Sequence, residues 1–211
     1  MKRIFVTGIG TGVGKTLVSA IITEALEADY WKPIQTGASE GTDSDTVRKL
    51  LTNKKSVIHP EAYCLQKPVS PHEAAQNEGM EIKVSNIIPP SAVKTLVIEG
   101  AGGLLVPLNS TETILNLIKY LDAEVIFVVR HYLGSINHTL LSGSAIKASG
   151  VKTAGMIYSG RANKASEDAI GGFLDYDVLG HIDEHSDFTP ALVSQYAKKL
   201  KPALLSKLIN S

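Results

Sequence analysis

Residues 4–16, Ile-Phe-Val-Thr-Gly-Ile-Gly-Thr-Gly-Val-Gly-Lys-Thr, constrain this chain more than any other stretch of its sequence. A β-branched and aromatic run passes at once into a glycine-rich turn, and Lys15 and Thr16 then open a segment with helical apolar periodicity. This strand, loop and helix order is typical of a phosphate-binding P-loop. Five residues separate Gly8 from Gly14, so the loop is one residue longer than the common pattern. An ordinary glycine-rich turn is the alternative, and the Lys-Thr pair where the loop joins the helix argues against it.

A P-loop of this kind predicts a specific chemistry. Glycines allow successive backbone N–H groups to point inward around a polyphosphate, and the N-terminus of the following helix adds its dipole. Lys15 is expected to reach the terminal phosphates, and the Thr16 hydroxyl to bind Mg²⁺. The sequence therefore predicts a nucleotide-binding loop that includes Gly12, Val13, Gly14, Lys15 and Thr16.

Charge and cysteine content exclude several classes of protein. The chain carries 21 Lys plus Arg and 21 Asp plus Glu, a formal net charge of zero, so no nucleic-acid partner is expected. The single cysteine, Cys64, cannot form an intrachain disulfide, which fits a reducing compartment. No apolar stretch approaches the roughly 20 residues that span a bilayer, so we expect a cytoplasmic protein with no membrane partner. At 44% hydrophobic residues, the range 1–211 is expected to form a single domain.

Strand-like and helix-like segments alternate along the chain, which predicts an α/β fold with a mainly parallel sheet. Pro33 is expected to end the second strand early, and residues 53–90 are irregular, with short helix candidates at 71–78 and 83–88. The predicted class is a P-loop NTPase-like three-layer fold, with helices on both faces of the central sheet. After the first strand, the predicted strands are 29–35, 95–98, 125–129, 153–158 and 177–182, and the predicted helices are 15–28, 44–51, 111–122, 135–148, 163–174 and 190–209.

A carboxylate ends the apolar strand at 95–98. Glu99 follows Thr-Leu-Val-Ile directly and precedes the glycine-rich run 100–103. Ligands of open α/β sheets gather at the carboxyl ends of the strands. An acid is costly at the end of a buried strand unless it is paired or binds something. The position of Glu99 at the end of a buried strand therefore makes it a candidate site residue, without support from any other motif.

Several motifs together resemble the dethiobiotin synthetase family, over residues 4 to about 182. The motifs are the long phosphate loop, Trp-Lys-Pro-Ile-Gln-Thr-Gly at 31–37, Asp-Ser-Asp at 43–45, Ser-Pro-His at 70–72, Val-Ile-Glu-Gly-Ala-Gly-Gly at 97–103 and Gly-Ser-Ile-Asn-His at 134–138. The resemblance implies an ATP-dependent cyclo-ligase of biotin biosynthesis. Its substrates would be ATP, CO₂ or bicarbonate and 7,8-diaminopelargonate.

The resemblance also implies roles for charged residues. Carbamate formation, attack on the γ-phosphate and ring closure each develop or move negative charge, so cations and Mg²⁺ would carry the chemistry. Lys15 would contact the terminal phosphates, and Lys32 would stabilise the carbamate and the phosphoryl group in transfer. Thr16, Asp45 and Glu99 would hold Mg²⁺ through oxygen. Asp45 and Lys32 taken alone are also compatible with solvated surface positions.

The substrate site is likewise implied by the resemblance. In the family, the start of the helix at 135–148 binds the substrate carboxylate across a two-fold dimer interface, so a homodimer is implied. Simple helix capping stays open as the alternative for Ser135 and Asn137. The implied substrate-binding residues are Thr11, which is also implied in catalysis, Thr36, Gly100, Ala101, Gly102, Gly103, Ser135, Ile136 and Asn137. Glu99, Gly102 and Ser159 complete the implied nucleotide site.

The nucleobase pocket departs from the family pattern at two positions. Ser159 stands where many members carry Asn, whose amide can read an adenine edge, and Asp183 stands where a proline is common. ATP is the expected nucleotide, and selectivity against other nucleoside triphosphates stays open.

Two other classes share the predicted fold. A ParA- or MinD-like dimeric ATPase switch of the partitioning and cell-division type is one, since the basic end of the chain at 196–205 resembles a membrane tether. Gly10 stands where those switches carry a signature lysine, and Pro202 would disturb an interfacial helix, so packing of this tail on the sheet is favoured. Another ATP-dependent ligase or amidase of cofactor synthesis is the second alternative.

Overall fold

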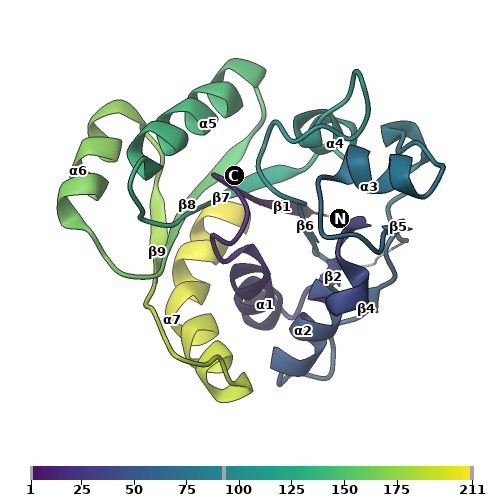
Figure 1. Ribbon diagram of the computed structural model, residues 1–211. Coiled ribbons are helices and arrows are strands. Elements are labelled where there is room, and N and C mark those ends of the chain that lie inside the picture. Colours follow the sequence, from purple (N-terminus) through teal and green to yellow (C-terminus); the bar gives the residue numbers. More distant parts are fainter. Residues whose placement is uncertain (1, 92–93, 210–211) are drawn as a thin grey trace.

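The central sheet of the protein is entirely parallel. A computed structural model describes residues 2–91 and 94–209, and in this part of the chain the main sheet has the order β4-β2-β6-β1-β7-β8-β9 (Figure 1). Every neighbouring pair in this sheet runs parallel. The strands are β1 (Arg3–Gly8), β2 (Asp29–Trp31), β4 (Ile58–His59), β6 (Leu96–Glu99), β7 (Glu124–Val129), β8 (Thr153–Ser159) and β9 (Val178–Ile182).

Helices cover the sheet on both sides, which confirms the predicted three-layer α/β fold. Figure 1 shows α1 (Lys15–Leu26), α2 (Asp43–Leu50) and α7 (Pro190–Ile209) gathered on one side of the strands. The opposite side carries α4 (Ile114–Tyr120), α5 (Ser135–Ser149) and α6 (Lys164–Phe173). The strand order reverses direction at β1, because the chain first moves to β2 and later from β6 across to β7. In open α/β sheets, ligands bind at the carboxyl edge beside such a point.

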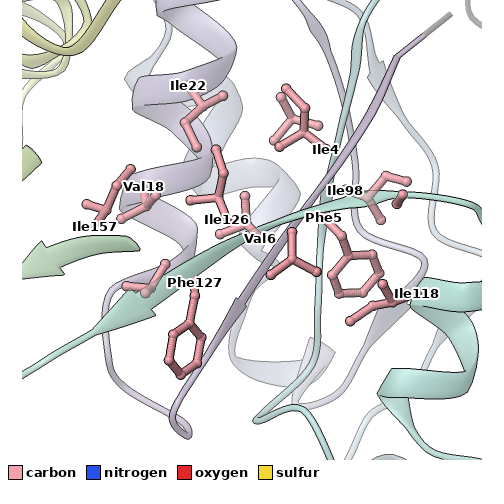
Figure 2. Packing of buried hydrophobic residues seen from close by; sticks show 14 of the residues in the cluster. Ile4, Phe5, Val6, Val18, Ile22, Ile98, Ile118, Ile126, Phe127 and Ile157 are labelled. Atoms are coloured by element: carbon pink, nitrogen blue, oxygen red, sulfur yellow. The ribbon is translucent and has the colours of Figure 1, made fainter. Parts of the chain in front are cut away.

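Strand β1 is the centre of the core. Ile4, Phe5 and Val6 are fully buried, because both faces of a parallel sheet are covered by helices. Successive side chains alternate between the faces, and Figure 2 shows Phe5 directed to the side of Ile118 from α4. Val18 and Ile22 of α1 lie on the other side. The phosphate loop therefore begins from a buried strand at the centre of the sheet.

The segment predicted as one strand over 29–35 is divided by Lys32 and Pro33. Its first part, β2, belongs to the main sheet, whereas β3 (Ile34–Gln35) pairs with β5 (Tyr63–Cys64) in a separate two-stranded sheet. Proline cannot donate to a ladder, which explains the break. Of the two short helix candidates, α3 (Pro71–Asn77) forms as predicted, whereas residues 83–88 yield a 3₁₀ turn, η2 (Val84–Asn86). A second 3₁₀ turn, η1 (Ala38–Glu40), precedes α2.

The C-terminal helix packs against the body of the protein, as the sequence predicts. Helix α7 contacts α1, β8 and β9, and its buried side chains recur at helical spacing. Pro202 lies inside this helix. Among the described residues, we find no helix with the length and apolar character needed to cross a membrane.

Candidate active site

The phosphate loop connects β1 to α1 in an open, glycine-dependent conformation. Gly12 and Gly14 have φ angles of 73° and 97°, in the left-handed region that favours glycine. A Cβ atom on Gly14 would lie 2.5 Å from the Ser159 hydroxyl oxygen, so a side chain has no room there. Ser159 ends β8 and is itself buried, so the structure brings this predicted nucleotide residue against the loop.

Lys15 begins α1 and is 7% exposed. Its ammonium donates a hydrogen bond of 2.7 Å to the carbonyl oxygen of Gly10, across the loop. Burial is the main cause that lowers the pKa of Lys15 to about 8. The Glu99 and Asp43 carboxylates act to raise this pKa, whereas the nearby Lys32 ammonium acts to lower it. A polyphosphate placed in the loop would add negative charge next to this buried cation, whose hydrogen bond to Gly10 is to a neutral carbonyl.

Three oxygen-bearing side chains converge beside the start of α1. The Thr16 hydroxyl oxygen lies 2.8 Å from Asp43 Oδ1 and 2.8 Å from Glu99 Oε1. A hydroxyl carries one proton and can donate to one of these oxygens at a time. Glu99 is 1% exposed at the end of β6, and β6 lies between β1 and β2 in the sheet. Oxygens crowded in this way, with two carboxylates among them, form a donor set that suits a hard divalent cation.

Lys32 is the cation that faces these carboxylates. Its ammonium pairs with Asp43 Oδ2 and lies 3.1 Å from Glu99 Oε1, and the residue is 5% exposed. Burial alone would lower the pKa of Lys32, but the Glu99 and Asp43 carboxylates outweigh burial and raise it. The ammonium therefore stays charged next to the opening of the phosphate loop. Trp31 pairs in register with Ile98, which places Lys32 beside the residue that ends β6.

Asp45, the predicted metal ligand, is not part of this cluster. Its carboxylate lies 2.5 Å from Arg48 on α2, and both side chains are more than half exposed. Asp43, two residues earlier, is the α2 carboxylate that contacts Thr16 and Lys32. Thr42 caps α2 by accepting the Asp45 N–H, so Asp43 is the first helical residue and Asp45 the third. Two positions apart on a helix correspond to a rotation of about 200°, so the two carboxylates face opposite ways.

The cluster opens into a cavity of about 1020 Å³ at the carboxyl edge of the sheet. The predicted residues among its lining are Thr11, Gly12, Gly14, Lys15, Thr16, Lys32, Thr36, Glu99, Ala101 and Gly102. Val13 is buried beneath the loop, and Gly100 packs against the Phe5 ring. Gly103 lies close to the backbone of Gly8 and Gly10, so it supports the loop.

Several residues at the cavity were not predicted from the sequence. Ser186, Asp187 and Phe188 approach it from the segment between β9 and α7, and Gln35 reaches it from β3. The Gln35 side chain accepts the backbone N–H of Asp43 at 3.0 Å and so helps to fix that residue. The available signal for Gln35 was a polar residue two positions after the Lys-Pro pair, at the end of a short strand. The 186–188 segment carries no motif that could have revealed it.

The predicted residues at the start of α5 do not line this cavity. The Ser135 hydroxyl is buried and accepts the backbone N–H of Tyr132 at 3.2 Å, whereas Asn137 is exposed. Large apolar side chains are exposed just before this helix and in its second turn. Leu133 is fully exposed and Leu141 is 62% exposed. The single chain therefore leaves this part of the predicted substrate site at the surface.

Asp183, the second departure in the predicted nucleobase pocket, is held by α7. Its backbone N–H donates to the Tyr196 hydroxyl, and that hydroxyl lies 3.0 Å from Asp183 Oδ2. This contact fixes the beginning of the segment that carries residues 186–188 into the cavity.

The parallel sheet, the phosphate loop before α1 and the carboxylate that ends β6 define a P-loop NTPase-like α/β protein. A family model described as "AAA domain" matches residues 2–191. ATP-dependent dethiobiotin synthetases from Cytophaga hutchinsonii and Christiangramia forsetii are each 51% identical to this chain. The alignments cover 95% and 96% of the chain and 97% and 98% of these relatives. The chain belongs to the dethiobiotin synthetase family.

Solved structures of partitioning ATPases share the fold. A plasmid partition protein from Borrelia burgdorferi superposes with a TM-score of 0.61 at 13% identity, over 98% of both chains. At this identity the likeness concerns architecture alone. Sequence identity is 51% to the synthetase from Cytophaga hutchinsonii and 13% to the partition protein. Family membership therefore follows the synthetases, and the alternative of a dimeric switch shares only the fold.

Proposed function

We infer that this protein is an ATP-dependent dethiobiotin synthetase, a ligase of biotin biosynthesis. The observation that carries this function is the 51% identity to synthetases of that name over nearly the full length of both chains. The buried lysines and carboxylates around the phosphate loop agree with it, because a reaction that moves negative charge needs cations positioned in advance.

We propose that the reaction proceeds in three steps. One amine of 7,8-diaminopelargonate adds to the carbon of CO₂ and loses a proton, which gives a carbamate. A carbamate oxygen then attacks the γ-phosphorus of ATP, and the bond to the bridging oxygen of ADP breaks. The second amine attacks the carbamoyl carbon and loses a proton, the ureido ring closes, and inorganic phosphate leaves with the C–O bond electrons.

Lys15 and Lys32 would stabilise the charge that moves in these steps. Lys15 would exchange the Gly10 carbonyl for phosphate oxygens, since both are acceptors within reach of one ammonium. Lys32 lies beside the phosphate loop, where the carbamate and the transferred phosphoryl group would meet. Thr11, Thr36 and the glycine-rich turn through Gly102 would line the space for the diamine.

Magnesium would be held by Thr16, Glu99 and Asp43, with Asp43 in the role first given to Asp45. The described residues contain no group of three or more His, Cys, Asp or Glu side chains that could hold a metal ion. Two carboxylates and one hydroxyl fit Mg²⁺, which usually keeps waters and binds substrate phosphates as its remaining ligands. A bound Mg²⁺ would neutralise charge on the phosphates during transfer.

A second copy of the chain would complete the substrate site. The free N–H groups at the start of α5 suit a carboxylate, and Asn137 would assist them. The exposed Leu133 and Ile136 at that helix start support burial against a partner, since large exposed apolar side chains favour association. The start of α5 would then present Ile136 and Asn137 to the partner's cavity, while the buried Ser135 hydroxyl holds the helix start through its contact with Tyr132.

The decisive experiment mixes the protein with 7,8-diaminopelargonate, MgATP and isotopically labelled bicarbonate. We expect labelled dethiobiotin with stoichiometric ADP by mass spectrometry. Lys32→Ala should lower the rate by about 100-fold or more, the size expected for a lost charge-stabilising group, whereas Lys164→Ala should not. Lys164 is 82% exposed on α6 and serves as the matched lysine control. ATP hydrolysis without labelled product would contradict the substrate assignment and favour the switch or another ligase.

A further inference from the structure

The Tyr30 hydroxyl contacts Glu99 of the candidate metal cluster from the protein interior, on the side away from the cavity. Tyr30 lies in β2, is fully buried, and donates a hydrogen bond of 2.9 Å to Glu99 Oε2. Tyr30 pairs in register with Val97 on β6, two residues before Glu99. The phenol therefore reaches Glu99 from the neighbouring strand and does not line the cavity.

The two carboxylate oxygens of Glu99 have different partners. Oε1 lies 2.8 Å from the Thr16 hydroxyl and 3.1 Å from the Lys32 ammonium, whereas Oε2 accepts from Tyr30. Burial, reinforced by the Glu99 charge, raises the pKa of Tyr30 well above its usual value, so the phenol remains a neutral donor. One oxygen is thus directed to the cavity side and the other is held in the protein interior.

We propose that Tyr30 is a positioning residue that keeps Glu99 a one-oxygen ligand and so makes the site select Mg²⁺ over Ca²⁺. Mg²⁺ demands near-octahedral geometry at about 2.1 Å. Ca²⁺ takes more ligands at longer distances and readily accepts both oxygens of one carboxylate. While Oε2 accepts the hydrogen bond from the buried phenol, Glu99 cannot bind a metal ion through both oxygens. The inference rests on the proposed function, since it concerns the metal of that same site.

The test replaces Tyr30 with phenylalanine, which removes only the hydroxyl. Wild-type and Tyr30→Phe proteins are saturated with ADP and loaded with Mn²⁺, whose electron paramagnetic resonance signal reports the bound ion. Mg²⁺ and Ca²⁺ then displace the Mn²⁺ in separate titrations. The ratio of the two half-displacing concentrations measures discrimination between the ions and requires no turnover.

We expect the preference for Mg²⁺ to fall about tenfold in Tyr30→Phe, the lower end of the usual effect of groups that orient metal ligands. Tyr176→Phe is the matched control, because its hydroxyl also donates a 2.9 Å hydrogen bond, to the Gly143 carbonyl, away from the cavity. If the ratio of half-displacing concentrations is unchanged in Tyr30→Phe, or if Mg²⁺ and Ca²⁺ both bind equally more weakly, the inference about Tyr30 is overturned and the proposed metal site is not. Failure of the wild-type protein with ADP to hold Mn²⁺ would instead overturn the proposed metal site.

A second measurement uses the wild-type protein and does not depend on the folding of the variant. A crystal structure with ADP and Mg²⁺ should show Glu99 bound through Oε1 only, with the Tyr30 hydroxyl still on Oε2. Ligation through both oxygens, with the phenol displaced, would contradict the proposal.

Discussion

The phosphate end of the site and the start of α5 are built in opposite ways. Around the phosphate loop, Lys32 and Glu99 are almost fully buried and each has several polar partners. At the start of α5, Leu133 is fully exposed and Asn137 lies at the surface. The first region is completed when a single chain folds. The second has the surface that we expect of a region completed by association.

This difference separates two kinds of energetic cost. Burying Lys32 with Glu99 and Asp43 costs desolvation energy that only good geometry offsets, so the folded core must hold these groups in place before any ligand arrives. Exposed apolar side chains cost little in the single chain and gain energy when covered. Substitutions in the first region should therefore change the chemistry directly, and substitutions in the second should act through assembly.

The largest effect is expected from charge removal at the phosphate end. Asp43→Asn removes a partner of both Thr16 and Lys32 and should lower kcat/KM by about 100-fold, equivalent to about 2.7 kcal/mol. The matched variant is Asp45→Asn on the same helix, where an exposed pair with Arg48 contributes at most about 0.5 kcal/mol. Steady-state rates of dethiobiotin formation distinguish the two. A larger loss in Asp45→Asn would show that Asp45 rotates into the site when ligands bind.

A moderate effect is expected at the start of α5. Leu133→Asp should leave the fold of the single chain intact, because the side chain is fully exposed. A charge buried in an apolar interface is unfavourable, so the protein should become monomeric by light scattering. The KM for 7,8-diaminopelargonate should then rise about tenfold, as expected for one lost charge-assisted contact of about 1.4 kcal/mol.

Phe173→Asp is the control for this comparison. Phe173 is 78% exposed at the end of α6, away from the start of α5, and the same charge there should change neither mass nor KM. A wild-type protein that is monomeric at assay concentration, with unaltered KM in Leu133→Asp, would remove the proposed role of a second copy.

The sequence predicted most of the phosphate end because its residues follow directly from buried strands. Lys15 and Thr16 begin the helix after β1, Lys32 follows β2, and Glu99 ends β6. Each position is fixed by local pattern and by the shared edge of a parallel sheet. The alternation of strands and helices likewise identified the layers.

The residues that the sequence could not resolve depend on helix phase or on contacts across strands. The choice between Asp43 and Asp45 depends on where α2 begins, and the Thr42 cap decides it. The contact of Tyr30 with Glu99 joins residues 69 positions apart, through β2 and β6. Residues 186–188 reach the cavity because α7 holds the preceding turn, which no local pattern records.

The smallest effect is expected at the contact that joins α1 to the end of α2. Glu24 on α1 accepts hydrogen bonds from the backbone N–H groups of Thr52 and Asn53, at 3.0 and 3.1 Å, and from both side chains. Burial alone would raise the pKa of Glu24, but these hydrogen bonds outweigh it and lower the pKa. Because the pKa is lower in the folded state, the stabilisation is present above the unfolded value of 4.5 and is lost as pH falls through the folded value.

Glu24→Gln should therefore reduce the free energy of unfolding by about 1 kcal/mol at pH 7, a figure that allows for solvent screening of this partly exposed group. The difference from wild type should shrink as the pH falls below 4.5, which urea denaturation at several pH values would measure. Helices α1 and α2 carry Thr16 and Asp43, so this contact also tests how the phosphate end is held. Mn²⁺ binding with ADP should be unchanged, since Gln35, Tyr30 and Lys32 fix the carboxylates locally. Weakened Mn²⁺ binding in Glu24→Gln would mean that the packing of the two helices, and not these local contacts, organises the metal cluster.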